Sequence, residues 1–272
     1  MITNGIILAA GRGERMRPLT DHTPKPMLDV HGQPLMAWAA QRMQAGGVQT
    51  LIVNTAWLGE HIESHFGDHA SGLPIHYSHE GLDFGRALET AGGIARALPL
   101  LPAAAPAFWL AAGDVYAPDF DFSTSDTLGR PMAWVDAFLR SPRLAHLWMV
   151  ANPDHHPHGD FTLTADGLLH HGADATGPRL TYATIGLFKP TLFSQAWSQI
   201  PAGNPAGVAS PLAPLLRQAM DAGLVSGARY DGQWVDVGTP ARLATLNATP
   251  PHATPAMAAR VRLAIKQVGN PL

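Results

Sequence analysis

The sequence predicts an α/β fold in which a mostly parallel sheet is flanked by helices. Three observations support this prediction. Short, continuous apolar runs alternate with helical segments through the first half of the chain, glycine or proline closes most of the helices, and the 27 glycines and 24 prolines are spread out as turn residues. Apolar strands that alternate with helices are typical of a parallel sheet covered on both faces.

The individual elements follow from the same patterns. In the first half, strands are predicted at 5–9, 50–54, 75–78 and 107–112, and helices at 34–45, 57–66 and 89–98. The second half mixes its elements, which indicates an α+β extension. Strands are expected there at 145–150, 161–164, 168–170, 180–188 and 233–237, with a hairpin turn at Asp166-Gly167, and helices at 211–222 and from Pro240 onward.

Most of the chain is predicted to form one domain, residues 1–248. Residues 249–272 differ in character and are expected to be a C-terminal surface tail, with a linker-like start at 250–255 and a short basic helix at 257–268. No internal repeat is found, and the prolines and glycines do not gather into low-complexity stretches.

Composition excludes several classes of function. The chain has 272 residues and a formal net charge of -3, so its overall charge does not favour binding to nucleic acid or to an anionic membrane. It has no cysteine, which excludes disulfides and thiolate metal sites and fits a reducing compartment. The apolar run at 5–10 is too short for a membrane span and lacks the basic start of a signal peptide. A cytoplasmic protein is therefore expected.

A glycine-rich loop follows the first predicted strand. Gly11 and Gly13 allow a ligand to approach the backbone closely, and the N–H groups of such a loop can bind an anion. Cationic side chains suited to phosphate lie in the same segment, at Arg12, Arg15 and Arg17. Shortly afterwards, Pro24 and Pro26 enclose Lys25 and restrict the backbone beside it. The segment is therefore predicted to bind phosphate groups.

Three other interpretations of this loop are weaker. A dinucleotide-binding fingerprint needs a third glycine where this chain has Met16. A Walker A loop needs Gly-Lys followed by Ser or Thr, which is absent. A turn without any ligand would not need three arginines and an enclosed lysine within so few residues.

Two aspartates far apart in the chain follow apolar strands. Asp114 comes after Gly113 at the end of the strand at 107–112, and Asp236 lies in Trp234-Val235-Asp236-Val237-Gly238-Thr239. Ligands of open α/β sheets bind at the carboxyl ends of the strands, and two carboxylates there can share a hard cation such as Mg²⁺. Each aspartate alone could equally be a helix cap or a turn residue.

These motifs resemble the sugar-1-phosphate nucleotidyltransferases. The matching segments are residues 8–20, Pro24-Lys25-Pro26-Met27, the Gly-Asp after the fourth strand, and residues 234–239, and the resemblance covers about residues 4–247. It implies a Rossmann-like, mostly parallel mixed sheet of the nucleotide-diphospho-sugar transferase type, with a mixed sugar-binding half. It also implies roles for the motif residues: Gly11, Arg12, Gly13 and Lys25 bind nucleotide, Arg15 and Lys25 act in catalysis with Asp114, and Asp114 and Asp236 hold Mg²⁺.

The resemblance extends to the base and sugar contacts. Two residues match positions at the nucleobase: Glu80, and Gly93 at the end of Leu88-Glu89-Thr90-Ala91-Gly92-Gly93. Alternatively, Gly92 and Gly93 serve only a close contact between helices. Asp160 matches a position that meets the sugar. Relatives often have asparagine before Gly-Asp to reach the sugar, where this chain has Ala112. The segment at 81–87 is longer than usual and is expected to be a loop.

Residues 152–161 and 234–239 are most similar to the N-acetylmuramate α-1-phosphate uridylyltransferases of cell-wall recycling. The expected reaction transfers UMP from UTP to a sugar 1-phosphate and releases pyrophosphate. Glucose or mannose 1-phosphate, phosphocholine, a non-catalytic sugar-nucleotide sensor and an NAD-dependent oxidoreductase remain alternatives. His155, His156 and His158 could suggest a transition-metal site, but a solvated loop or a partial sugar contact is favoured. The sequence does not fix the oligomeric state, and a monomer is among the alternatives.

Overall fold

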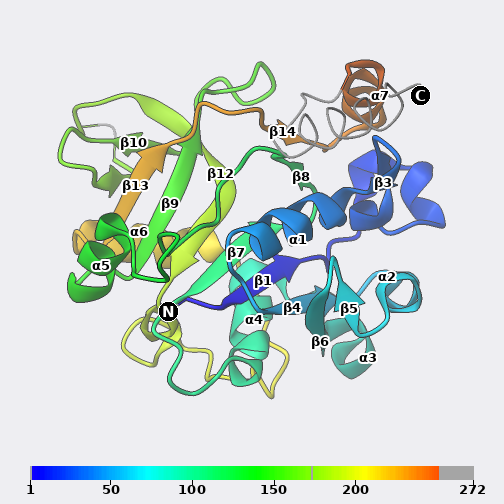
Figure 1. Cartoon of the computed structure of the whole chain (residues 1–272), viewed down its shortest axis with the longest axis horizontal. Coiled ribbons are helices and arrows are strands. Elements are labelled where there is room, and N and C mark those ends of the chain that lie inside the picture. Colours follow the sequence, from blue (N-terminus) through cyan, green and yellow to red (C-terminus); the bar gives the residue numbers. More distant parts are fainter. Residues whose placement is uncertain (1, 173, 251–272) are drawn as a thin grey trace, which may run out of the picture.

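The structure is a computed structural model that describes residues 2–172 and 174–250. A 10-stranded mixed sheet runs through its centre (Figure 1). Its strands are β1 (Asn4–Leu8), β4 (Thr50–Thr55), β5 (His69–Ala70), β6 (Leu73–His79), β7 (Phe108–Ala112), β9 (Ala145–Val150), β10 (Phe161–Leu163), β11 (Leu169–His170), β12 (Arg179–Phe188) and β13 (Val225–Arg229).

The parallel part of the sheet comes from the first half of the chain, as predicted. β7, β1, β4 and β6 are neighbours in that order and pair in parallel. The second half then extends this sheet with antiparallel partners, because β12 pairs with β7, β9 and β10 in the opposite direction. The predicted hairpin is confirmed: β10 and β11 pair antiparallel, and Gly167 in the turn between them has a φ of 79°.

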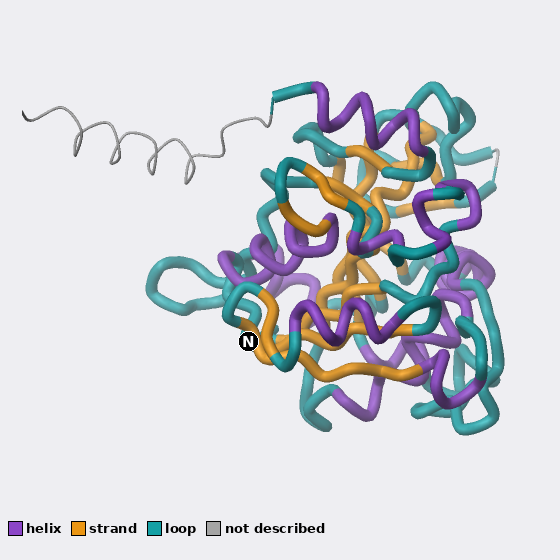
Figure 2. Tube along the Cα trace, turned by 90° about the vertical axis from the view of Figure 1, so that its right-hand side faces the viewer, coloured by secondary structure: helices purple, strands orange, loops and turns teal. Residues whose placement is uncertain are grey.

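Helices cover both faces of the sheet (Figures 1 and 2). They are α1 (Leu35–Ala45), α2 (Gly59–Phe66), α3 (Glu80–Phe84), α4 (Glu89–Ala97), α5 (Ala133–Arg140), α6 (Leu212–Asp221) and α7 (Pro240–Ala248). Short 3₁₀ helices are η1 (Glu14–Met16), η2 (Leu19–Asp21), η3 (Lys25–Met27), η4 (Leu98–Leu100) and η5 (Pro190–Phe193).

Alternation along each strand divides the core into two layers. In β1, Ile7 packs with α1, α2 and α5 on one face, whereas Ile6 packs with α4 and α6 on the other. In β7, Trp109 lies in the same layer as Ile7, and Phe108 lies in the same layer as Ile6. Because successive side chains of a strand point to opposite faces, a continuous apolar run is what a sheet covered on both sides requires.

Two small sheets lie beside the main one. β8 (Val115–Tyr116) pairs antiparallel with β14 (Val235–Asp236), and β2 (Asp29–Val30) pairs with β3 (Gln33–Pro34). The last predicted strand, 233–237, is therefore shorter than expected and lies outside the main sheet. The position of β14 matters for the site. Its partner β8 follows shortly after the end of β7, so the pairing brings β14 to the carboxyl end of β7.

Other differences from the sequence prediction have local causes. The segment at 81–87, expected to be a loop, begins inside α3, a helix of 5 residues. Helix α5 and strand β13 were not predicted, because one is only 8 residues long and the other is built partly from small and polar residues. The boundary expected at residue 248 coincides with the end of α7. Most of the tail predicted at 249–272 lies outside the described residues, so the division into domain and tail stays a prediction.

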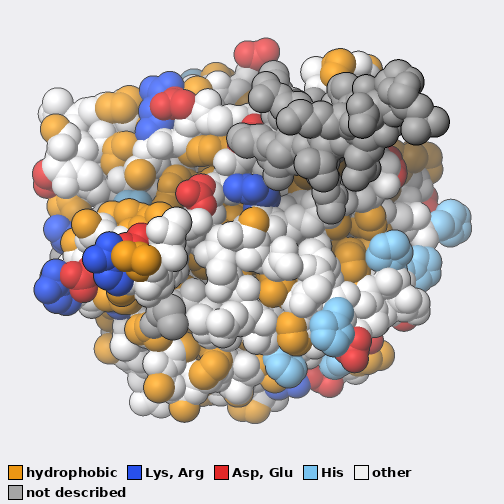
Figure 3. Space-filling view, viewed as in Figure 1, with side chains coloured by type: hydrophobic (Ala, Val, Ile, Leu, Met, Phe, Trp, Pro, Cys, Tyr) orange, Lys and Arg blue, Asp and Glu red, His pale blue; other side chains and the backbone are white. Residues whose placement is uncertain are grey.

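The surface is mixed in character. On the face seen in Figure 3, Lys and Arg side chains lie beside Asp and Glu side chains rather than gathering into one field. Among the described residues, no helix is both long enough and apolar enough to cross a bilayer.

Candidate active site

Lys25 and Asp114 form an ion pair at the carboxyl edge of the parallel strands. Lys25 opens η3 between its two prolines, and Nζ of Lys25 lies 2.5 Å from Oδ2 of Asp114. The lysine side chain is only 9% exposed, whereas that of Asp114 is 36% exposed. The ammonium group is thus fixed from one side and keeps further N–H donors for another anion.

The pairing of β8 with β14 brings the second predicted aspartate next to the first. Asp236 is the register partner of Val115, and the N–H of Val237 donates to the carbonyl oxygen of Asp114 over 3.1 Å. Both aspartates line one cavity of about 340 Å³, called here the acidic cavity. The other residues around it are Arg15, Val115, His155, His156, Asp160, Thr181, Tyr182, Thr184 and Trp234.

Each aspartate uses one carboxylate oxygen for a cation. Oδ2 of Asp236 accepts a hydrogen bond of 2.7 Å from Nη1 of Arg242, as Oδ2 of Asp114 does from Lys25. Within the described residues, Oδ1 of each aspartate has no hydrogen bond or ion pair. No group of three or more metal-binding side chains occurs in that part of the chain. Two carboxylates with one uncommitted oxygen each suit a hard ion such as Mg²⁺ when phosphate oxygens supply further ligands.

The glycine loop leads from β1 toward this edge of the sheet. Gly11 is exposed, and a Cβ atom there would meet nothing within 4 Å, so its backbone is open to a ligand. Gly13 has a φ of 66°, and a Cβ atom there would lie 3.2 Å from Cβ of Lys25. Gly13 therefore allows the turn that brings the loop against Lys25. Any other residue at this position would have a strained backbone. A 3₁₀ helix, η1, follows the loop and places Arg15 at the acidic cavity.

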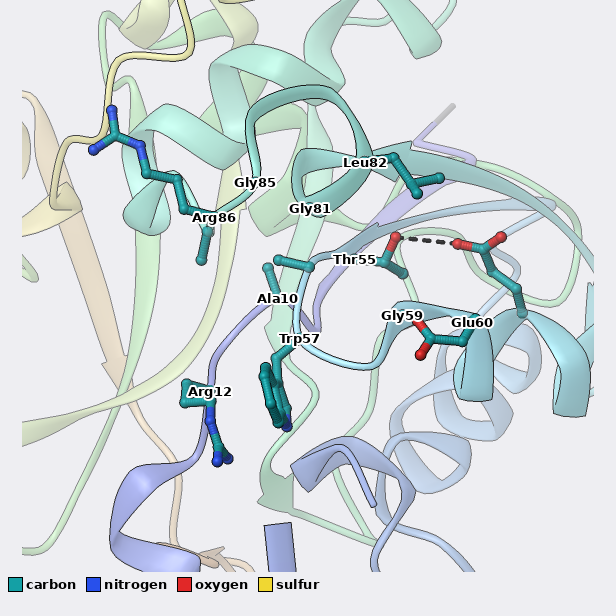
Figure 4. Close-up of a pocket in the computed structure, with 13 residues that line it drawn as sticks. Ala10, Arg12, Thr55, Trp57, Gly59, Glu60, Gly81, Leu82, Gly85 and Arg86 are labelled. Carbon is teal, nitrogen blue, oxygen red and sulfur yellow. Dashed lines mark hydrogen bonds between the residues drawn. The ribbon is translucent and has the colours of Figure 1, made fainter. Parts of the chain in front are cut away.

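Arg12 is held by its neighbours rather than extended into solvent. Its guanidinium group lies 3.7 Å from the ring centroid of Trp57 and donates to the carbonyl oxygen of Thr20 over 2.8 Å. Asp21 accepts a further hydrogen bond from it. Figure 4 shows Arg12 and Trp57 side by side below Ala10. They line a cavity of about 430 Å³, the side cavity, formed also by Thr55, Ala56, Gly59, Glu60, Glu63, Gly81, Leu82, Gly85, Arg86 and Ala87.

Arg12 also borders a third space, a central cavity of about 690 Å³. Two residues predicted to meet the sugar, Ala112 and Asp160, line this cavity, and Asp160 lines the acidic cavity as well. Oδ2 of Asp160 accepts from the backbone N–H of Tyr182 over 2.8 Å. The other residues that line the central cavity are Leu8, Ala10, Gly11, Asn54, Glu80, Ala87, Glu89, Thr90, Leu110, Asp114, Phe161, Tyr182, Thr184, Pro211, Leu212, Ala213 and Leu216. Residues of the predicted phosphate, metal and sugar contacts thus surround two neighbouring cavities that share lining residues.

Glu80 and Gly93, which the resemblance assigns to the nucleobase, pack against each other, and Glu80 also borders the central cavity. The side chain of Glu80 is fully buried and accepts hydrogen bonds from Asn54 and from the backbone of Leu88. Burial raises the pKa of this carboxyl, and those two hydrogen bonds partly oppose the rise. A Cβ atom at Gly93 would come within 2.8 Å of Nδ2 of Asn54 and closer still to Glu80. Gly93 is therefore packed against this buried pair.

Sequence reasoning missed three residues of the site. Asn54 lies next to the last residue of the buried strand β4, and a polar side chain among apolar ones there indicates a polar partner. Trp57 and Arg242 carried no such signal, because their roles depend on which residues the fold places beside them. The histidine segment also reaches the site. Nε2 of His155 accepts from Nη1 of Arg242 at 2.8 Å, and Nε2 of His156 lies 3.0 Å from Oδ1 of Asp160.

Comparison with known proteins identifies the family of this chain. The nucleotidyl transferase family model matches residues 4–125. An N-acetylmuramate α-1-phosphate uridylyltransferase of Neisseria meningitidis serogroup B is 44% identical over 239 residues, which cover 88% of this chain and 94% of the relative. One from Caulobacter vibrioides is 33% identical over 86% of this chain and 91% of its own length.

A solved structure, the UDP-glucose pyrophosphorylase from Acinetobacter baumannii, has a TM-score of 0.70 to this chain. It covers 98% of this chain and 100% of the other, at 15% identity, so the likeness is one of fold. Because curated relatives match it over most of its length, the chain belongs to the nucleotidyl transferase family, among the sugar-1-phosphate nucleotidyltransferases.

Proposed function

We propose that this protein transfers UMP from UTP to N-acetylmuramic acid α-1-phosphate, forming the UDP-sugar and pyrophosphate. One observation carries the chemical part of this proposal: Asp114, paired with Lys25, and Asp236 face the same cavity beside the glycine loop. The names of the Neisseria and Caulobacter relatives support the choice of nucleotide and sugar. The reaction would serve peptidoglycan recycling in the cytoplasm, with residues 1–248 acting as one catalytic domain.

In the proposed reaction, a phosphate oxygen of the sugar 1-phosphate attacks the α-phosphorus of UTP. The bond from that phosphorus to the bridging oxygen of the β-phosphate breaks, and pyrophosphate leaves in line with both electrons of the bond. The second pKa of a phosphate monoester is about 6, so the attacking oxygen is already largely ionised at neutral pH. The reaction therefore needs positioning and charge neutralisation rather than a general base.

The residues of the site suit these two tasks. The open backbone at Gly11 and the guanidinium groups of Arg12 and Arg15 would bind the β- and γ-phosphates. Lys25 would donate to the α-phosphate while Asp114 holds its ammonium group in place. Asp114 and Asp236 would hold Mg²⁺, which supplies positive charge to the phosphate oxygens. Ala112 and Asp160 would face the sugar.

The proposal is tested by pyrophosphate release from UTP with a panel of sugar phosphates. N-acetylmuramic acid, N-acetylglucosamine, glucose and mannose 1-phosphates are compared, with CTP and GTP in place of UTP, and the product is identified by its mass. We expect the highest kcat/KM for UTP with the muramic acid phosphate. A higher kcat/KM for glucose 1-phosphate would refute the substrate assignment. Tight UTP binding without pyrophosphate release from any sugar phosphate would refute the reaction itself.

A further inference from the structure

A buried hydrogen-bonded bridge joins the two walls of the central cavity. At one end, Oδ1 of Asn54 accepts from the backbone N–H of Ala9 over 2.6 Å. In the middle, Nδ2 of Asn54 donates to Oε1 of Glu80 over 2.6 Å. At the other end, Oε2 of Glu80 accepts from the backbone N–H of Leu88 over 2.7 Å. Three segments far apart in the sequence are thereby held to one another.

The bridge is inaccessible to solvent. Asn54 is 3% exposed, and Glu80 and Leu88 are 0% exposed. A buried carboxylate is costly unless both its oxygens are satisfied, and here each accepts a hydrogen bond from the protein itself. Gly93 makes room for the pair, because a Cβ atom at that position would overlap Oε1 of Glu80. The two hydrogen bonds do not fully offset the desolvation of the carboxyl, because its pKa is still raised, so its retention in this place indicates a role for its position.

The two ends of the bridge lie next to the cavity walls. Ala9 leads into Ala10 and Gly11, which line the central cavity on the glycine-loop side. Leu88 leads into Glu89 and Thr90, which line the same cavity at the start of α4. Asn54 and Glu80 border the cavity between these walls, but they are almost fully buried and their hydrogen bonds go to each other and to the backbone. A change in the length of the bridge would move the walls relative to each other.

We infer that Asn54 and Glu80 are positioning residues that set the spacing of the walls around the bound nucleotide without contacting it. This inference rests on the proposed function, because it takes the central cavity as the nucleotide site. It differs from the role that the family resemblance gives to Glu80, in which the side chain meets the nucleotide directly. The two roles predict different results when the charge of Glu80 is moved to position 54.

The experiment exchanges the carboxylate and the amide between positions 80 and 54. Glu80→Gln leaves an amide that cannot accept hydrogen bonds at both ends, and Asn54→Asp places two carboxylate oxygens against each other. The double variant Asn54→Asp/Glu80→Gln can rebuild every bond. Its carboxylate at position 54 would accept from Ala9 and from the amide at position 80, whose oxygen would accept from Leu88. The negative charge is kept, but it now belongs to position 54.

The readouts are the Kd of UTP by calorimetry, the KM of each substrate and the melting temperature. Each single variant should weaken UTP binding about 10-fold or more, the scale of losing a hydrogen bond to a buried charge. The KM of the sugar phosphate at saturating UTP should change less, which a general loss of structure would not produce. The double variant should return to within about 3-fold of the wild type, since the bonds are restored.

Two results would overturn the inference. A double variant that melts near the wild-type temperature but binds UTP no better than the weaker single variant would mean that Glu80 contacts the nucleotide. Wild-type affinity for UTP in both single variants would mean that the bridge does not set the spacing of the cavity walls. Because Kd is measured without turnover, wild-type protein that binds UTP but releases no pyrophosphate would refute the proposed reaction alone. Wild-type protein that does not bind UTP would refute both.

Discussion

Lys25 and Asp114 meet at 2.5 Å although they are 89 positions apart in the chain. The pair combines a buried cation with a partly exposed carboxylate that lines the acidic cavity. Its two members have separable roles in the proposed reaction: the lysine neutralises the phosphate, and the aspartate orients the lysine and offers an oxygen to a metal ion. This separation allows the contributions to folding and to catalysis to be measured apart.

We expect Lys25→Met to lower kcat at least about 100-fold, the scale of losing one main electrostatic group. It should also lower the melting temperature, because Asp114 then lacks its partner. The double variant Lys25→Met/Asp114→Asn should regain part of the melting temperature and none of the activity. Pyrophosphate release and thermal melts provide both readouts. Recovery of activity in the double variant would contradict the role given to Lys25.

The second aspartate should govern the requirement for metal. Asp236→Asn removes a charged ligand, so the Mg²⁺ concentration for half-maximal activity should rise at least about 10-fold. The control is Asp231→Asn, which alters an exposed aspartate paired with Arg229 on the surface. Titration with Mg²⁺ after treatment with a chelator measures the effect, and direct binding of Mn²⁺ in the presence of UTP gives a readout independent of turnover. Equal half-saturation in the two variants would be evidence against metal binding by Asp236.

The sequence predicted the parallel sheet and the residues at its edge because both depend on local patterns. Apolar runs such as 50–54 and the segment from Gly11 to Lys25 contain their own signals. The pairing of β8 with β14, which brings Asp236 beside Asp114, depends on contacts between distant segments and was available only through the family resemblance. Arg242 is a different case: its partner Asp236 lies only six residues earlier, but the turn into α7 that lets the two side chains meet carries no distinctive sequence pattern.

Glu80 and Gly93 illustrate a different limit. Their positions match the family, and the structure packs them against each other at the edge of the central cavity, which Glu80 lines. A pattern of residues identifies neighbours in the fold more readily than it identifies which of them touches a ligand. Burial decides between the two, and burial of a charged residue cannot be inferred from its type, because glutamate is rarely enclosed.

Acid stability should depend on His146. This residue contacts Trp134, Phe138 and Trp148, and burial lowers its pKa from 6.5 to about 4. The unfolded chain therefore binds a proton near pH 6.5 that the folded protein does not bind until about pH 4. Stability is fully present above pH 6.5 and is lost as the pH falls toward 4.

Between pH 7.5 and pH 5, this residue should account for a loss of about 1–2 kcal/mol in the free energy of unfolding. His146→Phe should remove that part of the pH dependence, whatever its effect on stability at pH 7.5. Urea titrations of both proteins at the two pH values measure the difference, with His76→Phe as an exposed control. An unchanged pH dependence in His146→Phe would mean that the pKa of this histidine is the same in the folded and unfolded protein.

Trp57 should support phosphate binding through Arg12. The indole ring lies against the guanidinium group at 3.7 Å, and its Nε1 donates to the carbonyl oxygen of Thr20, which also accepts from Arg12. Stacking therefore limits the positions that the arginine can take. Loss of a cation–π contact of this kind costs about 0.5–2 kcal/mol. If the geometry of Arg12 is what binds UTP, Trp57→Leu should raise the KM for UTP by about 3- to 30-fold.

The phenylalanine variant separates the ring from its hydrogen bond. Trp57→Phe keeps an aromatic face for Arg12 but cannot donate to Thr20, so its KM for UTP should lie nearer the wild type than that of Trp57→Leu. A further comparison uses Arg12→Ala: once the arginine is absent, changing Trp57 as well should have little additional effect on UTP. Independent, additive effects of the two substitutions would mean that Trp57 acts on the nucleotide by another route, through the side cavity that it lines.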